Sequence, residues 1–398
     1  MRYPEYMDWR TKLIHTQTNT PVGYRSLAPS THRASTNVFP SVAEIRSDWR
    51  QDRMPYTYGL YGTPTAVELC LRIAELEGGG HTLLTSSGQA AIALIHLSFL
   101  TPGDHVLIPH NIYGPNQELA DGLISRLKVE VEYYDPLIGA QITSLLKPNT
   151  RLVWLESPGS ITMETQDVPA ITAAVRAHNT THSRKVVVAL DNTYAAGILF
   201  DAFAHGVDIS MQALTKYVGG HSDILLASVT TQSEEIFETL GPTHRALGMA
   251  VSPDDCSLAL RGLQTLGVRL AHIEQSTLTL AKWLSTRPEI ELVLHPAFES
   301  CPGHEAFNRD FTGSAGIFSI VFRKGTTQQQ VAAFVDTLKL FKIGYSWGGT
   351  TSLALPYPTY GRITKRYGTR LVRLNIGLEA TTDLQQDLES ALATISTN

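Results

Sequence analysis

Short apolar runs, typical of strands, alternate along this chain with stretches in which apolar residues recur at helical spacing. The first clear helical stretch carries four such residues: Val67, Cys70, Leu71 and Ala74. Thr65 and Glu68 have the spacing of a capping box, and Pro64 stands at the helix entrance. The glycine run 78–80 is typical of a helix end. The pattern therefore predicts a helix from Pro64 to these glycines.

Apolar runs and helical stretches continue to alternate as far as residue 211. The runs that predict strands lie at 83–85, 105–108, 129–134, 152–155, 186–190 and 209–211. The helical stretches lie at 90–99, 117–127 and 169–178. Strands separated by helices predict right-handed crossovers and a mainly parallel sheet covered on both faces. Ligands of such sheets bind outside the carboxyl ends of the strands. Four polar residues fall near these ends: Ser87, Tyr113, Asp191 and Lys216.

The pattern changes past about residue 260. Apolar runs at 291–294, 317–322 and 371–375 are mixed with helical stretches at 268–284 and 327–338 and a closing helix that carries Leu384, Leu388, Leu392 and Ile395 on one face. This order predicts a smaller α+β domain. At 398 residues the chain exceeds the size at which a single core stops growing. We expect an irregular N-terminal arm at 1–60, a large ligand-binding domain at 61–260 and a small domain at 261–398.

Composition narrows the possible partners. With a formal charge of -5 and no basic tract, the chain is not expected to bind nucleic acid or an anionic membrane surface. It has no apolar run long enough to span a bilayer and no secretory leader pattern, so we expect a cytoplasmic protein. Cys70, Cys256 and Cys301 are far apart and form no CxxC pair, and the histidines show no metal-ligand spacing. We therefore expect neither disulfides nor a metal site.

The stretch 208–223 carries the first candidate chemistry. An apolar strand leads to Thr215 and Lys216, and the glycine pair 219–220 follows. A lysine amine in a partly dry pocket has a lowered pKa and can form an imine with an aldehyde cofactor. The alternative is a solvated surface lysine. A phosphate on such a cofactor would suit the turn of Ser87, Gly88 and Gln89, because a helix N-terminus offers free N–H groups, with Thr215 beside it.

Two further residues match what such a cofactor needs. Asp191 ends the apolar strand 186–190 and could keep a pyridine nitrogen protonated, which makes the ring a better electron sink. Tyr113 could stack on the ring and handle protons near the imine. The alternatives are an aspartate that caps a turn and a tyrosine of the core or rim. Their order along the chain, with Lys216 a short crossover after Asp191, favours the functional interpretation.

Eight motifs, in consistent order from roughly residue 26 to the C-terminus, resemble the transsulfuration family of pyridoxal-phosphate enzymes. They are Tyr58-Gly59, Gly62-Thr63-Pro64-Thr65, Glu75-Leu76-Glu77-Gly78-Gly79, Glu156-Ser157-Pro158, Asp191-Asn192-Thr193, Thr215-Lys216-Tyr217, Gly220-His221-Ser222-Asp223 and Ser346-Trp347-Gly348-Gly349. The resemblance implies a type I aminotransferase-like fold with Lys216 as the Schiff-base lysine. It also implies pyridoxal 5'-phosphate as cofactor and a homotetramer made of two dimers, in which the arm helps to build the neighbouring subunit's site.

Within the family, the segments 156–164 and 345–349 resemble the branch that cleaves L-cystathionine by β-elimination to homocysteine, pyruvate and ammonia. The γ-acting members tend to carry glutamate where this chain has Tyr345 and asparagine where it has Ser160. The resemblance implies that Arg373 binds the substrate carboxylate, with Tyr345, Ser346 and Trp347 beside it. A γ-synthase or γ-lyase, a methionine γ-lyase, a cysteine desulfhydrase or racemase side activity, and a cofactor-bound regulator without turnover are the alternatives.

Two positions depart from the family pattern. Leu60 stands where members often have an arginine that reaches the phosphate across the dimer interface, and Ala213 stands where a serine is common. Phosphate binding would then depend more on Tyr58, Thr215 and the helix N-terminus. We expect weaker cofactor binding than in relatives with the arginine, or compensation by another cation.

Overall fold

The computed structural model describes residues 8–14, 23, 26–46, 50, 56–357 and 364–396. Seven strands form one sheet in the order β1-β7-β6-β5-β4-β2-β3. Their bounds are β1 His81–Thr85, β2 His105–Pro109, β3 Glu130–Tyr134, β4 Thr150–Glu156, β5 Val187–Asp191, β6 Ile209–Gln212 and β7 Ala227–Thr231. Only β7 runs antiparallel to its neighbours, so the sheet is mainly parallel, as predicted.

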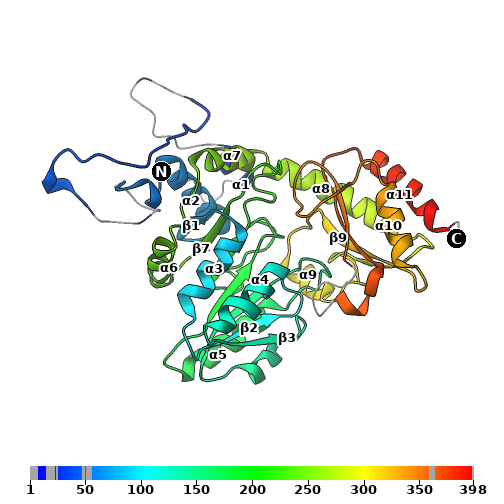
Figure 1. Cartoon of the computed structure of the whole chain (residues 1–398), viewed down its shortest axis with the longest axis horizontal. Helices are drawn as coiled ribbons and strands as arrows, with labels where there is room; N and C mark the ends of the chain where they lie inside the picture. The colour runs from blue at the N-terminus through cyan, green and yellow to red at the C-terminus, as the bar shows by residue number, and fades with distance from the viewer. Residues whose placement is uncertain are drawn as a thin grey trace.

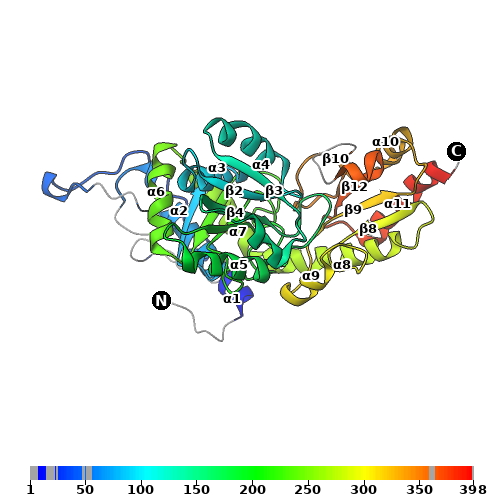
Figure 2. The same cartoon turned by 90° about the horizontal axis from the view of Figure 1, so that it is seen from below.

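Helices cover both faces of this sheet. Their bounds are α2 Pro64–Glu77, α3 Gly88–Phe99, α4 Gly114–Leu119, α5 Val168–Thr181, α6 Glu234–Ala246 and α7 Pro253–Gln264. Figure 2 shows α3 and α4 on one side of the sheet and α5 on the other. Two separate apolar clusters correspond to these faces. The hydrophobic pattern predicted no element between residues 211 and 260, so β7, α6 and α7 are additions to the predicted fold.

The start of α2 differs in detail from the predicted capping box. Thr63 caps the helix by accepting the N–H of Ala66, whereas the hydroxyl of Thr65 contacts the backbone of Ser30 and His32. Gly78, with φ of 70°, ends the helix as predicted. Leu71 belongs to the predicted apolar face but is 50% exposed, and Leu69 is buried instead.

The C-terminal part forms a second sheet in the order β10-β11-β12-β9-β8. Its strands are β8 Ile290–Leu294, β9 Ile317–Phe322, β10 Lys342–Ile343, β11 Leu353–Pro356 and β12 Leu371–Asn375. The helices of this part are α8 Leu266–Leu284, α9 His304–Asp310, α10 Gln328–Thr337 and α11 Thr381–Ser396. Three of the four predicted α11 residues, Leu384, Leu388 and Leu392, are buried, and Ile395 packs against the same cluster. Figure 1 shows this part beside the larger sheet.

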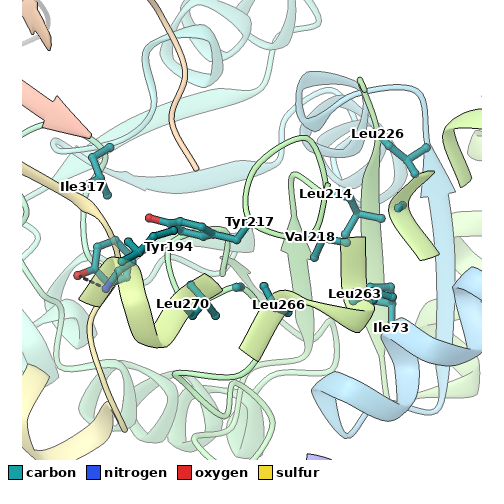
Figure 3. Close-up of a cluster of buried hydrophobic side chains, with 14 of the residues drawn as sticks. Ile73, Tyr194, Leu214, Tyr217, Val218, Leu226, Leu263, Leu266, Leu270 and Ile317 are labelled. Carbon is teal, nitrogen blue, oxygen red and sulfur yellow. Dashed lines mark hydrogen bonds between the residues drawn. The ribbon is translucent and has the colours of Figure 1, made fainter. Parts of the chain in front are cut away.

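Loops that follow β5 and β6 connect the two sheets. The hydroxyl of Tyr217 accepts the N–H of Gly316 at 2.8 Å, and the hydroxyl of Tyr194 accepts that of Ala315 at 3.2 Å, just before β9 begins. Figure 3 shows Tyr194 and Tyr217 beside α8, with Leu214 and Val218 in the same cluster. The loop that carries Lys216 is therefore held by buried side chains on either side of the lysine.

The described part of the N-terminal segment packs on its own chain at some places and is exposed at others. Of the predicted arm at 1–60, residues 1–7, 15–22, 24–25, 47–49 and 51–55 lie outside the described residues. The helix α1 Trp9–Ile14 packs beside α7 (Figure 1) with Leu13 buried, whereas the side chains of Leu27, Val38 and Val42 are more than four-fifths exposed. None of the helices within the described ranges is both long and apolar enough to cross a membrane.

Candidate active site

A cavity of about 540 Å³ lies at the carboxyl ends of the parallel strands. All but one of the predicted site residues line it: Ser87, Gly88, Gln89, Tyr113, Asp191, Thr215, Lys216, Tyr345, Ser346, Trp347 and Arg373. The first seven come from the larger sheet and its loops, and the last four come from the C-terminal part. The exception, Tyr58, lies outside the lining.

Lys216 lies on the turn that follows β6. Its N–H donates to the carbonyl of Ala213 at 3.0 Å, and its Nζ donates a hydrogen bond to Ser346 Oγ. Nζ also lies 5.4 Å from the centre of the Trp347 ring. Burial, with a smaller effect of the Arg373 charge, lowers the pKa of Lys216 to about 8. The amine is thus a far better nucleophile near neutral pH than an ordinary lysine.

Asp191 is the last residue of β5 and is almost completely buried. Its Oδ1 accepts the N–H of Thr193 at 3.0 Å, and the hydroxyl of Thr193 accepts the N–H of Ala213 at 2.9 Å. This pair of contacts joins the loop after β5 to the loop that carries Lys216. Burial raises the pKa of Asp191, and the Lys216 charge opposes that rise. A carboxyl in this position suits a cationic ring nitrogen, which would offset its burial.

Glu156 is a cavity residue to which the sequence reasoning assigned no role. It ends β4 as Asp191 ends β5, and the two residues are direct partners in the register of these strands. Burial and the Asp191 charge raise the pKa of Glu156 well above its ordinary range. Asp191 was predicted because it ends an apolar strand, where ligands of parallel sheets bind, and Glu156 ends an apolar strand in the same way. The sequence therefore contained the pattern that indicates Glu156.

The predicted phosphate cradle has the features of an anion site. Ser87 caps α3 by accepting the N–H of Ala90 at 3.1 Å, and the first N–H groups of an α-helix, here those of Gly88 and Gln89, have no acceptor within the helix. Gln89 Oε1 is a buried oxygen that no described residue contacts by a hydrogen bond. The Thr215 hydroxyl is already engaged with the backbone of Leu226.

The opposite wall of the cavity comes from the C-terminal part. Arg373 lies on β12 and donates from Nη1 to the carbonyl of Ser160 at 3.1 Å and from Nη2 to that of Ser346 at 3.4 Å. Ser346 has φ of 80°, a left-handed conformation that a non-glycine residue rarely adopts. Tyr345 is 82% exposed at the mouth, whereas Arg373 is 7% exposed. The guanidinium is therefore oriented inside the wall, while the tyrosine ring faces solvent.

Tyr113 immediately precedes α4 and is 40% exposed on the cavity wall. Burial raises the pKa of its phenol, and the nearby Asp191 and Glu156 charges raise it further. The phenol is therefore neutral at physiological pH, able to donate or accept a hydrogen bond.

Tyr58 and Leu60 lie before α2, away from the cavity of their own chain. Tyr58 is 49% exposed, and its ring centre lies 6.3 Å from that of Tyr61. The cationic side chains that line the cavity are Lys216 and Arg373. Neither belongs to the Ser87–Gln89 turn, so the cradle receives no arginine from this chain's lining residues.

One histidine does meet two carboxylates in space, which the sequence spacing did not indicate. His105, Glu130 and Glu132 offer ligand atoms within 4.8 Å of one another at the edge between β2 and β3. Lys147 Nζ lies 2.8 Å from Glu130 and also bonds Glu132, so an ammonium group already offsets part of the charge of the two carboxylates.

The two sheets and the lysine-bearing cavity define a type I aminotransferase-like fold, which confirms the predicted fold class. A family model described as Cys/Met metabolism PLP-dependent enzyme, where PLP is pyridoxal phosphate, matches residues 10–393. The chain belongs to this family, as the motifs predicted.

Named relatives support the more specific assignment. The chain is 42% identical to "Cystathionine beta-lyase MetC" of Escherichia coli strain K12, over 91% of this chain and 92% of the relative. It is 38% identical to "Cystathionine beta-lyase" of Haemophilus influenzae, over 98% of this chain and 99% of the relative. A solved structure of cystathionine gamma synthase from Xanthomonas oryzae pv. oryzae superposes with a TM-score of 0.89 at 27% identity, covering 98% of this chain and 99% of that chain.

Proposed function

We propose that this protein is a pyridoxal-phosphate-dependent carbon–sulfur lyase that converts L-cystathionine to homocysteine, pyruvate and ammonia by β-elimination. The observation that carries the proposal is the amine of Lys216, whose pKa burial lowers to about 8, in one cavity with the carboxyl of Asp191 and the guanidinium of Arg373. The names of the relatives at 38–42% identity favour the β-lyase over the γ-acting alternatives.

The residues present fit pyridoxal 5'-phosphate. Lys216 would hold its aldehyde carbon, Asp191 its ring nitrogen, and Ser87, Gly88 and Gln89 its phosphate. When bound, this cofactor supplies an electron sink for negative charge at the substrate's Cα. Because the Thr215 hydroxyl is shared with Leu226, we expect it to contribute less to the phosphate than its position in the sequence suggested.

Different residues of the cavity would act on the different groups of the substrate. Arg373 would bind the α-carboxylate, since a planar guanidinium can donate two parallel hydrogen bonds to it. Lys216 would take the Cα proton, for which a pKa near 8 is well matched to neutral pH. Tyr113 would assist proton transfer at the amine or the leaving sulfur. Ser346 and Trp347 would keep the amine of Lys216 in place, and Tyr345 would form a neutral rim.

The N-terminal arm and Tyr58 point to a second copy of the chain as the partner. Leu27, Val38 and Val42 of the arm are exposed in the isolated chain, and Tyr58 lies outside the cavity of its own chain. A homotetramer of two dimers, in which Tyr58 completes a neighbour's phosphate site, would use both features. The three cysteines are free and buried, which fits the reducing cytoplasm that we propose as its location.

Product identification tests the proposed reaction. The purified yellow protein is incubated separately with L-cystathionine, L-cysteine and L-methionine, and the keto acid and thiol are identified. We expect pyruvate and homocysteine from L-cystathionine, at a higher kcat/KM than for the other two amino acids. Formation of 2-oxobutyrate would instead indicate a γ-acting enzyme. Pyruvate from L-cysteine alone would indicate a desulfhydrase.

A further inference from the structure

Glu156 is a buried carboxyl in the cavity for which the proposed reaction has no use. It is 4% exposed and lies at the end of β4, beside Asp191. Burying a carboxyl without a cation is costly, and a second acid beside it increases the cost. The surroundings of this carboxyl indicate what the arrangement provides.

The Glu156 carboxyl joins two parts of the cavity wall that are separate in the chain. Its Oε2 accepts the backbone N–H of Tyr113 at 2.7 Å. The backbone N–H and the hydroxyl of Ser160 lie close enough to the same carboxyl to oppose the rise of its pKa. The carbonyl of Ser160 in turn accepts a hydrogen bond from Arg373 Nη1 at 3.1 Å. Glu156 therefore contacts Tyr113 directly and lies beside Ser160, which in turn contacts Arg373.

We propose that Glu156 is a positioning residue, which fixes Tyr113 and, through Ser160, the guanidinium of Arg373 relative to Asp191. The inference rests on the proposed function, because it assigns the orientation of the substrate's carboxylate to Arg373. In this role Glu156 differs from a merely structural acid, because Tyr113 and Arg373, which it would orient, face the substrate from different segments.

The charged and titratable groups around Glu156 are Asp191 on β5, Tyr113 before α4, and Arg373, Lys216 and Glu118 along the same cavity. Burial and the Asp191 charge keep the pKa of Glu156 well above its ordinary range, which favours the protonated form. A protonated carboxyl still accepts hydrogen bonds. Glutamine, which is neutral and of the same shape, should therefore replace it with little loss, whereas alanine removes the acceptors.

The test compares Glu156→Gln and Glu156→Ala with the wild-type holoenzyme. The matched control is Glu164→Gln, since Glu164 is a buried acid on the same segment that contacts Thr162 and Arg366 and does not line the cavity. For Glu156→Ala we expect kcat/KM for L-cystathionine to fall about 100-fold, because a displacement of about 1 Å can cost this much. Glu156→Gln and Glu164→Gln should stay within about 5-fold of the wild type.

A second readout does not depend on turnover. L-Alanine has the amine and carboxylate of the substrate but no leaving sulfur, and its binding is followed by the absorbance of the bound cofactor. The apparent Kd for L-alanine should rise about 10-fold in Glu156→Ala and remain near the wild-type value in Glu156→Gln. Thermal melting of each holoenzyme identifies a variant that fails to fold, in which case Glu156→Gln alone decides through its expected near-wild-type behaviour.

Two results would overturn the inference. If Glu156→Ala keeps wild-type kcat/KM and L-alanine affinity, the carboxyl positions nothing that the substrate uses. If Glu156→Gln is as impaired as Glu156→Ala, the charge or proton of Glu156 matters rather than its acceptor atoms. Absence of keto acid from the wild type would instead reject the proposed function, and the L-alanine titration would still judge the role of Glu156.

Discussion

The floor and the mouth of the cavity differ in how their side chains are held. By the floor we mean Asp191, Glu156 and Lys216. Asp191 and Glu156 end neighbouring parallel strands, and both carboxyls are buried. At the mouth, Tyr345 is 82% exposed and extends from a segment between β10 and β11. Charges on the floor interact through a medium of low polarity, whereas groups at the mouth are screened by water. Changes on the floor should therefore alter the chemistry most, and changes at the mouth should mainly alter substrate preference.

Lys216→Ala should give the largest effect and tests the floor directly. Removing the amine eliminates both the group that would hold the cofactor and the base for the Cα proton. We expect kcat/KM for L-cystathionine to fall by about 10³-fold or more. The exposed Lys282 provides a matched control, because Lys282→Ala removes an amine from the surface of α8. A Lys216→Ala enzyme that retains wild-type turnover would rule out the proposed mechanism.

Arg373→Lys tests the wall between floor and mouth. The substitution keeps the positive charge but loses the planar pair of donors, and hydrogen bonds to charged groups contribute about 1.5–3 kcal/mol. We expect KM for L-cystathionine to rise about 10- to 100-fold, with a smaller change in kcat. Steady-state kinetics with L-cystathionine measure both constants. An unchanged KM would show that the carboxylate is bound elsewhere.

Glu77, at the end of α2, is a buried acid outside the cavity lining that contacts β6, the strand that precedes Lys216. Its buried carboxyl accepts a hydrogen bond from Gln212 Nε2 at 2.7 Å and another from Ser210, both on β6. Burial raises the pKa of Glu77 from 4.5 to about 7. Because the folded state binds this proton more tightly, its contribution to stability is fully present below pH 4.5 and is lost as pH rises to about 7.

Glu77→Gln should remove this pH dependence. The difference in unfolding free energy between wild type and variant should change by about 3 kcal/mol between pH 4.5 and pH 7.5, in favour of the variant at the higher pH. Denaturant unfolding of the holoenzymes at a series of pH values measures it. Parallel pH profiles for the two proteins would show that Glu77 does not titrate in this range.

The sequence predicted the floor better than the mouth for a physical reason. Asp191 and Lys216 follow apolar strands, and the carboxyl ends of parallel strands meet at one edge, so local pattern was sufficient. Lys216 and Ser346 are 130 residues apart in the chain, and only the family resemblance brought the C-terminal wall to the site. Tyr58 was assigned to the site by the same resemblance, yet it does not line the cavity of its own chain.

The prediction of helices and strands from local sequence pattern was limited in a similar way. The helices and strands that were predicted lie within a few residues of the observed bounds, whereas β7, α6 and α7 were missed. Of these, β7 was missed for a physical reason. Its sequence, Ala-Ser-Val-Thr-Thr, contains one large apolar residue, although all five residues are buried between β1 and β6. Burial of small and hydroxyl side chains depends on neighbouring strands and leaves little local pattern.

Tyr345→Phe should give the smallest effect and tests the mouth. The substitution removes one hydroxyl from a largely exposed ring, so stability should change by less than about 0.5 kcal/mol. We expect kcat/KM for L-cystathionine to stay within about 3-fold of the wild type, because a solvated hydroxyl loses little when water replaces its contact. Steady-state kinetics with L-cystathionine and L-cysteine would detect any change in preference. A loss of more than 10-fold for L-cystathionine would place Tyr345 among the groups that hold the substrate, and the contrast between floor and mouth would then fail at its most exposed residue.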